Sequence, residues 1–254
     1  PIMIWTVLTS IYLARSGMRT VGKWSVVMIV PVIFVTVWTL LGSIKQMRIG
    51  QILPVMDHPF KTIANVAFET FSFPFAETVL FLCLGGALSR DNKHYKMFLL
   101  ALTYTVLTFL AIFFRNITLL GREMMRDTFF PSFVAVRILE MGDFFARVEG
   151  SVSSNFLLAG VAKITICLLA AAKGMNALFN LGDHKPMVLP CGMLALGLAP
   201  NLFKNAMEMF ENLPYYPYYS FPFQVIIPFI IWIAGEIHSR RHKAANKAPI
   251  PETS

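Results

Sequence analysis

Charged residues are scarce in this chain of 254 residues. Asp, Glu, Lys and Arg together make up 14% of the sequence, whereas an ordinary soluble domain carries about 25%. Hydrophobic residues make up 56%, and the mean hydropathy is +0.61. This composition excludes an ordinary soluble domain and predicts an all-α, polytopic membrane protein embedded in a lipid bilayer.

Cysteine is also scarce, and histidine shows no paired spacing. Cys83, Cys167 and Cys191 all lie within apolar runs, where they behave as small hydrophobic residues. We therefore expect no disulfide framework, no metal site and no cofactor. The net charge is +8, but the 22 Lys and Arg residues are divided into short groups and form no basic patch, so we expect no nucleic-acid partner.

Long apolar runs dominate what is present, and they predict seven membrane spans. The first, 1–14, is too short to cross a membrane and has no initiator Met or signal region before it, so we expect the chain to begin inside a helix. The others are 24–44, 62–88, 97–120, 152–172 (running on to 179), 187–203 and 218–237. The helical membrane region is thus 1–238, and the polar, basic tail 239–254 is expected to be disordered.

The distribution of basic residues predicts the orientation. The loops at 15–23, 90–96 and 173–185 and the C-terminal tail hold 12 Lys and Arg against four acidic residues, when Glu236 at the end of the last span is counted with the tail. The loops on the other side hold nine basic and eight acidic residues. Because cytoplasmic loops carry the excess of Lys and Arg, the C-terminus is predicted to be cytoplasmic, with a weak attraction to anionic lipid.

The third span carries two features that are costly at membrane depth. Pro74 cannot donate a backbone hydrogen bond to Thr70, so the helix is expected to kink or open across 70–76. Glu77 costs on the order of 3 kcal/mol in mid-span unless it is paired, protonated or hydrated. An opened backbone at this depth lines a cavity or meets a ligand. The alternative is a simple kink in which the Ser72 or Thr70 hydroxyl satisfies the backbone.

Three further polar residues lie within predicted spans. Glu69 is nearer the external end and is interpreted as an interfacial charge. Lys163 is expected to face the interior of the helix bundle, where Glu77 is a partner by charge; a structural ion pair and a coupling site both stay open. Thr165 either faces the same interior or bonds back to the carbonyl four residues earlier.

Two segments between spans carry amphipathic patterns. Apolar positions between charges predict an amphipathic helix at the external interface within 131–150, with a break and an N-cap at Gly142–Asp143. Five basic and five acidic residues between Arg115 and Glu149 favour local ion pairing. The segment 211–223, ENLPYYPYYSFPF, is typical of an aromatic belt at the membrane surface.

Four stretches resemble the B-subunit family of bacterial spore germination receptors. They are FPFAE at 73–77, PSFVAVRILEMGDFFARVEG at 131–150, AKIT at 162–165 and DHKPMVLPCGM at 183–193. That family belongs to the amino acid–polyamine–organocation transporter superfamily, whose members have a leucine-transporter-like inverted repeat of five plus five spans. The resemblance implies that this chain corresponds to spans four to ten and lacks the first three. The Pro74 span is then the sixth, the broken helix that opens the second repeat.

The resemblance also implies a function, that of a nutrient germinant receptor subunit in the inner membrane of the spore. Its ligand is implied to be an amino acid or a similar small nutrient, and its partners to be A-type and C-type receptor subunits. The implied ligand-binding residues are Ser72, Phe73, Pro74, Phe75, Ala76, Glu77 and Thr165, with Glu77 and Lys163 as candidate coupling residues. The missing first and third spans are implied to supply the rest of the pocket.

Two other classes of protein stay open at this point. A secondary amino-acid transporter would use the same pocket, with Glu77 or Lys163 coupling proton movement to uptake. An intramembrane aspartyl protease needs two neighbouring carboxylates, whereas Asp143 and Asp183 are predicted to lie in loops on opposite faces of the membrane. We therefore expect no enzymatic activity.

Overall fold

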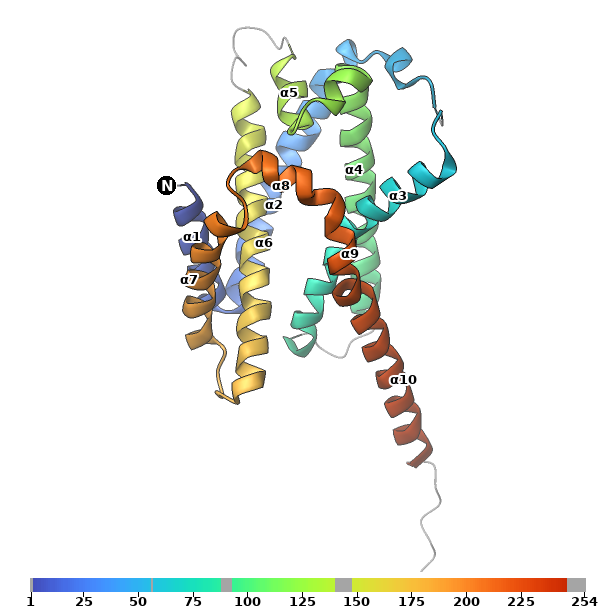
Figure 1. The fold of residues 1–254 in the computed structure, drawn as a ribbon. Coiled ribbons are helices and arrows are strands. Elements are labelled where there is room, and N and C mark those ends of the chain that lie inside the picture. The colour runs from blue at the N-terminus through green and yellow to red at the C-terminus, as the bar shows by residue number, and fades with distance from the viewer. Residues whose placement is uncertain (1, 56, 88–92, 140–147, 246–254) are drawn as a thin grey trace, which may run out of the picture. The chain divides into compact units, whose positions relative to one another are not determined.

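The computed structural model describes residues 2–55, 57–87, 93–139 and 148–245 (Figure 1). The regular elements within these ranges are all helical, which confirms the all-α prediction. The chain forms two compact units, each built from two separate segments. Unit 1 is Pro1–Asp57 with Cys83–Glu208, and unit 2 is His58–Leu82 with Met209–Ser254.

Unit 1 contains most of the long helices. Its described elements are α1 (Ile2–Ser16), α2 (Met18–Ser43), η1 (Ile44–Gln46), η2 (Ile49–Ile52), α4 (Lys93–Arg126), α5 (Pro131–Arg137), α6 (Val148–Phe179) and α7 (Lys185–Leu202). Helices α1, α6 and α7 lie side by side (Figure 1). Together with Val21 of α2, their apolar faces form a core of Val7, Ile11, Leu13, Ala14, Val161, Leu168, Leu169, Ala172 and Val188.

Gly192 allows α7 to approach α1 closely. A Cβ atom at this position would lie 2.5 Å from both Cγ1 and Cδ1 of Ile11. Ile11 is itself only 5% exposed, so its side chain could not move aside without repacking the core. The absence of a side chain at 192 is therefore part of the packing between these two helices.

Helix α4 ends its regular course where the sequence predicts the end of a span, at about residue 120. Gly121 has φ 72° and ψ 174°, a conformation that favours glycine. Just before it, the carbonyl of Thr118 accepts a hydrogen bond from the backbone N–H of Arg48 at 3.0 Å. Just after it, Arg122 forms an exposed ion pair with Asp57 at 3.0 Å.

The helix predicted within 131–150 is shorter than its pattern indicates. The described helix α5 ends at Arg137, and residues 140–147, including the predicted cap at Gly142–Asp143, lie outside the described residues. Pro131 begins α5 because its fixed φ suits the first helical turn. The buried residues Ala135 and Val136 anchor α5 in unit 1.

Unit 2 contains an interrupted helix and the C-terminal helices. Its described elements are α3 (Phe60–Thr70), η3 (Phe71–Phe75), η4 (Ala76–Ala87, up to Leu82), η6 (Leu213–Tyr215), α9 (Tyr216–Phe221), η7 (Pro222–Ile226) and α10 (Ile227–Ala245), and α8 (Ala206–Asn212) leads into it. Helices α3 and α9 are in contact, and α9 also contacts η3. Helix α10 continues past the predicted boundary at 238, and residues 246–254 lie outside the described part.

Five helical stretches of the described chain are long and apolar enough to cross a membrane. They are Met18–Gln46, Phe60–Cys83, His94–Arg126, Gly150–Phe179 and Ala206–Ser239. Helix α1 is shorter, and α7, predicted as a span, is not among the five because of its composition: its 18 residues include the polar Lys185 and Asn201. Large apolar side chains on α10 are exposed, among them Trp232 at 64%, as expected of a surface that faces lipid.

Candidate functional site

The helix that begins at Phe60 opens at Pro74, within the range predicted from the sequence. Phe73 has φ −130° and ψ 115°, an extended conformation inside a stretch of wider, π-type turns. The backbone N–H of Ala76 consequently donates to the carbonyl of Phe71. In a regular α-helix that N–H would bond to the carbonyl of Ser72, so the break removes the helical donor of Ser72.

A side chain from the C-terminal part of the chain replaces that donor. Nε2 of Gln224 donates to the carbonyl of Ser72 at 3.2 Å. The hydroxyl of Ser72 in turn donates to Oε1 of Gln224 at 2.8 Å. Ser72 therefore bonds to both the oxygen and the nitrogen of the Gln224 amide, and Ser72 is only 2% exposed. The Ser72 hydroxyl thus bonds to η7 and not to the opened backbone, whereas the alternative of a simple kink satisfied by Thr70 stays open.

Further polar groups extend this contact to Glu77. The hydroxyl of Ser220 lies 2.9 Å from that of Ser72 and 3.2 Å from Oε1 of Gln224. Nε2 of Gln224 also donates to the hydroxyl of Tyr216 at 3.1 Å, and Tyr216 donates to Oε1 of Glu77 at 3.2 Å. These five residues form a continuous set of hydrogen bonds, which we call the break network.

The direction of the hydrogen bonds in the break network follows from the chemistry of its members. The carbonyl of Ser72 can only accept, so the NH2 group of Gln224 must face it. The same NH2 group reaches Tyr216, whose own hydrogen is then directed to Glu77. The Glu77 carboxylate thus receives a donor within the protein, which lowers the cost of holding a charge at this depth.

Aromatic rings pack beside the break network. Phe73 meets Tyr216 edge to face with ring centroids 6.0 Å apart, and Tyr216 meets Tyr219 in the same way at 5.2 Å. Of the other predicted site residues, Pro74 is exposed, Phe75 is half-buried and Ala76 is buried. The break therefore buries Ser72 and Ser220, leaves the other members of the break network half-buried, and exposes Phe73 and Pro74.

The other two predicted site residues belong to α6 of unit 1. The hydroxyl of Thr165 is buried and donates to the carbonyl of Val161 at 2.7 Å, the back-bonding alternative. The same carbonyl accepts from Ser10 of α1 at 3.3 Å, so this polar contact joins two packed helices. Whether Thr165 also faces a ligand, as the resemblance implies, stays a prediction.

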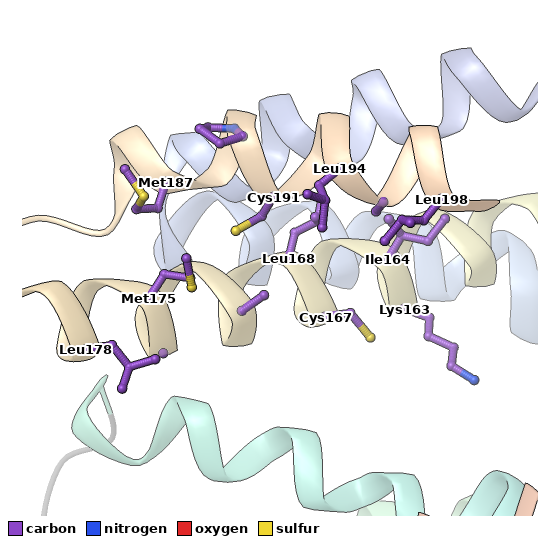
Figure 2. Close-up of a pocket in the computed structure, with 14 residues that line it drawn as sticks. Lys163, Ile164, Cys167, Leu168, Met175, Leu178, Met187, Cys191, Leu194 and Leu198 are labelled. Carbon is purple, nitrogen blue, oxygen red and sulfur yellow. The ribbon is translucent and has the colours of Figure 1, made fainter. Parts of the chain in front are cut away.

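Lys163 lies at one end of an apolar groove of about 800 Å³ between α6 and α7. Figure 2 shows its amino group directed away from α7, while Cys191, Leu194 and Leu198 of α7 face the groove. The predicted pair of Lys163 and Glu77 would join the two units and stays a prediction. Within the residues that the structure describes, no group of three or more His, Cys, Asp or Glu side chains is placed to hold a metal ion.

Sequence reasoning missed three members of the break network. Tyr216 and Ser220 lie in the segment 211–223 that the sequence predicts as an aromatic belt, and Gln224 lies near the beginning of the last predicted span. Their spacing of four residues places them on one face of a helix, and a glutamine inside an apolar run is itself costly in a membrane. These three polar residues on one helix face are the pattern that could have predicted a polar contact at this position.

Five apolar helical stretches of the described chain, one of them interrupted at Phe73, define a polytopic membrane protein. The family model described as spore germination protein matches residues 1–200, and the chain belongs to this family. The family resemblance found in the sequence is thereby confirmed. The superfamily, the ten spans and the inverted repeat stay predictions, and no solved structure matches the chain with statistical significance.

Two curated relatives come from Bacillus subtilis (strain 168). Spore germination protein KB is 22% identical over 195 residues, which cover 75% of this chain and 52% of the relative. The putative spore germination protein YfkT is 19% identical over 229 residues, which cover 89% of this chain and 62% of the relative. The chain thus spans between half and two thirds of the length of these relatives.

Proposed function

We propose that the chain is a membrane subunit of a spore nutrient germinant receptor. It binds an amino acid or a similar small nutrient at the break around Pro74 and signals germination together with A-type and C-type subunits. It lies in the spore inner membrane with its C-terminus in the cytoplasm, and it catalyses no reaction. Family membership supports the germination role, and the break network is the observation that carries the location of the site.

The break network favours recognition of a ligand ammonium group. The carbonyl of Ser72 and the carboxylate of Glu77 are both hydrogen-bond acceptors, and each is occupied by a neutral donor, Gln224 or Tyr216. A charged ammonium group makes stronger hydrogen bonds than these neutral donors do. A nutrient with an amino group therefore replaces Gln224 and Tyr216 at these two acceptors.

Such a replacement supplies a route for the signal. Gln224 is the side chain that ties η7 to the broken helix, and η7 runs directly into α10. Ligand binding that releases Gln224 frees the start of α10 from the break. The two conformations, one with Gln224 held at the break and one with Gln224 released, then differ in affinity for the nutrient, as a two-state receptor requires.

Substitution of Glu77 tests the site. Glu77→Gln in the full-length protein removes the charge beside the break and is expected to shift the nutrient dose response of germination at least tenfold, while the protein still accumulates. Glu69→Gln is the matched control, since Glu69 lies on the same helix and outside the break network. A normal dose response in the Glu77→Gln spores would overturn the proposed site.

A secondary amino-acid transporter is the second candidate. The Glu77 carboxylate accepts a hydrogen bond from Tyr216, which itself accepts one from Gln224. A carboxylate in such a chain of hydrogen bonds at membrane depth is a candidate for coupling proton movement to uptake. Uptake of a labelled amino acid by liposomes that contain the full-length protein alone would favour this candidate. Binding without uptake, together with dependence on partner subunits, would favour the receptor.

A further inference from the structure

Arg115, on α4 of unit 1, is a buried cation whose hydrogen-bond partners are neutral. Its side chain is 2% exposed. Nη1 donates to the hydroxyl of Thr39 at 2.9 Å, and Nε and Nη2 donate to Oδ1 of Asn116 at 3.2 and 2.8 Å. The ion pairing predicted among the charges from Arg115 onward therefore does not include Arg115 within the described part of the chain.

The charge of Arg115 is incompletely satisfied by these bonds. A guanidinium group has five N–H donors, and the contacts to Thr39 and Asn116 use three of them. Among the residues that the structure describes, no carboxylate is bonded to Arg115. A buried cation without a counter-charge is strongly disfavoured, so an anion bound beside Arg115 would stabilise it.

A small cavity lies against Arg115. Its volume is about 210 Å³, and α2, α4, α5 and α6 of unit 1 all contribute to its wall. Its polar lining residues are Thr36, Thr39, Arg115, Ser132 and Asn155, and Val32, Val35 and Val152 are among its apolar ones.

The polar wall of the cavity is held in place by hydrogen bonds. Nδ2 of Asn116 donates to the hydroxyl of Ser132 at 3.0 Å, which fixes α5 against α4. Nδ2 of Asn155 lies 3.4 Å from the carbonyl of Val32, which links α6 to α2. The hydroxyl groups of Thr36 and Thr39 donate to the carbonyls of Val32 and Thr36, whereas the Ser132 hydroxyl accepts from Asn116 and can donate to an anion. The cavity is thus a formed site with one charged group, one available hydroxyl donor and an apolar remainder.

We propose that this cavity binds a small carboxylate through Arg115. A guanidinium fork matches the two oxygens of a carboxylate, and a single cation among neutral groups is balanced by one negative charge. The cavity is smaller than the roughly 300–1,000 Å³ of pockets for drug-sized ligands, which limits the occupant to a few heavy atoms. The site lies within unit 1, whereas the break network lies within unit 2, so it is a second site beyond the proposed function.

Acetate is the probe that tests the proposal. Thermal unfolding of the purified full-length protein is followed as sodium acetate replaces sodium chloride at constant ionic strength. We expect the unfolding temperature of the wild-type protein to rise with acetate. Arg115→Met should weaken acetate binding at least tenfold, whereas Arg122→Met, which removes an exposed arginine from the same helix, should leave it unchanged.

A second variant keeps the test decisive if Arg115→Met does not fold. Ala159 is exposed at the wall of the cavity, so Ala159→Phe fills the space while leaving Arg115 intact. We expect this variant to fold and to lose the acetate effect. Full acetate binding by Ala159→Phe would overturn the proposal.

The chain's own acids supply one more outcome. If acetate binds only after Glu140→Gln, Asp143→Asn and Glu149→Gln are combined, a carboxylate of the protein itself occupies the site, and the proposal is wrong. No acetate effect in either the wild-type protein or this combined variant would overturn it as well.

Discussion

Gln224 bears on the broken helix more than any other single residue of the break network. Its amide supplies the donor that Ser72 loses at the break and accepts the Ser72 hydroxyl in return. A buried carbonyl left without a donor costs about 1–3 kcal/mol. The stability of the break therefore depends on a side chain 152 positions away in the sequence.

Gln224→Leu tests this dependence. The leucine fills a similar volume but cannot donate to Ser72, so we expect the free energy of unfolding to fall by about 1–3 kcal/mol. Unfolding of the purified protein in detergent measures the change. Asn201→Leu serves as the control, because the amide of Asn201 is exposed and bonds only within its own helix, to Gly197. Equal stability of the two variants would count against the role of Gln224.

Tyr216→Phe separates the hydroxyl from the ring. The phenylalanine keeps the edge contact with Phe73 but breaks the link between Gln224 and Glu77. We expect a lower sensitivity of germination to nutrient and a stability loss of about 0.5–1.5 kcal/mol. The neighbouring Tyr219→Phe changes an exposed ring in the same cluster and should leave both quantities unchanged.

The sequence predicts some residues of the site well and others not at all. Pro74 determines the break through its missing N–H, a local property, and so its position could be predicted. The partners that complete the site come from another helix and depend on tertiary packing. Arg115 lies near the end of the predicted span 97–120, where an arginine is typical of the membrane interface, so its burial could not be predicted.

At the scale of elements, the packing of α7 against α1 rests on Gly192. We expect Gly192→Ala to lower the free energy of unfolding by about 1–3 kcal/mol, because the added methyl group overlaps Ile11. Gly197→Ala lies on the same helix with no atom within 4 Å of the added Cβ, and it should be neutral or slightly stabilising. Unfolding of both variants in the same detergent distinguishes local packing from helix propensity.

Cysteine scanning tests the exposure of the break. The structure buries Ser72 and Ala76 and exposes Phe73 and Pro74. In a background without Cys83, Cys167 and Cys191, we expect single cysteines at 73 and 74 to react with a water-soluble thiol reagent faster than those at 72 and 76. Uniform protection from 72 to 76 would show that lipid, not water, meets the break.

The extents of the helices follow from the sequence more closely than their interruptions do. Apolar runs predict α2, α4 and α6 because a membrane-length helix needs only local composition. The last predicted span contains a change from α-helix to π-helix at 222–226, where η7 joins α9 to α10, and the apolar pattern does not predict it. That change accompanies Gln224, whose side chain reaches across to the broken helix.

At the scale of the whole molecule, the distribution of basic residues predicts which ends face the cytoplasm. In the cysteine-free background, His58→Cys is expected to be labelled by a membrane-impermeant reagent in intact cells, and Ser239→Cys only after permeabilisation. The reverse pattern would contradict the orientation. Labelling of both positions in permeabilised cells is the control for reactivity.

The separation of Ser72 and Gln224 along the chain has a consequence for synthesis in the cell. At the usual rate of roughly 5–20 residues per second, the ribosome makes the glutamine roughly 8–30 seconds after the serine. During that interval the opened carbonyl has no partner from η7. The carbonyl of Ser72 in the third predicted span therefore gains its donor only after the last span has been made. A chain released before Gln224 is added lacks this hydrogen bond.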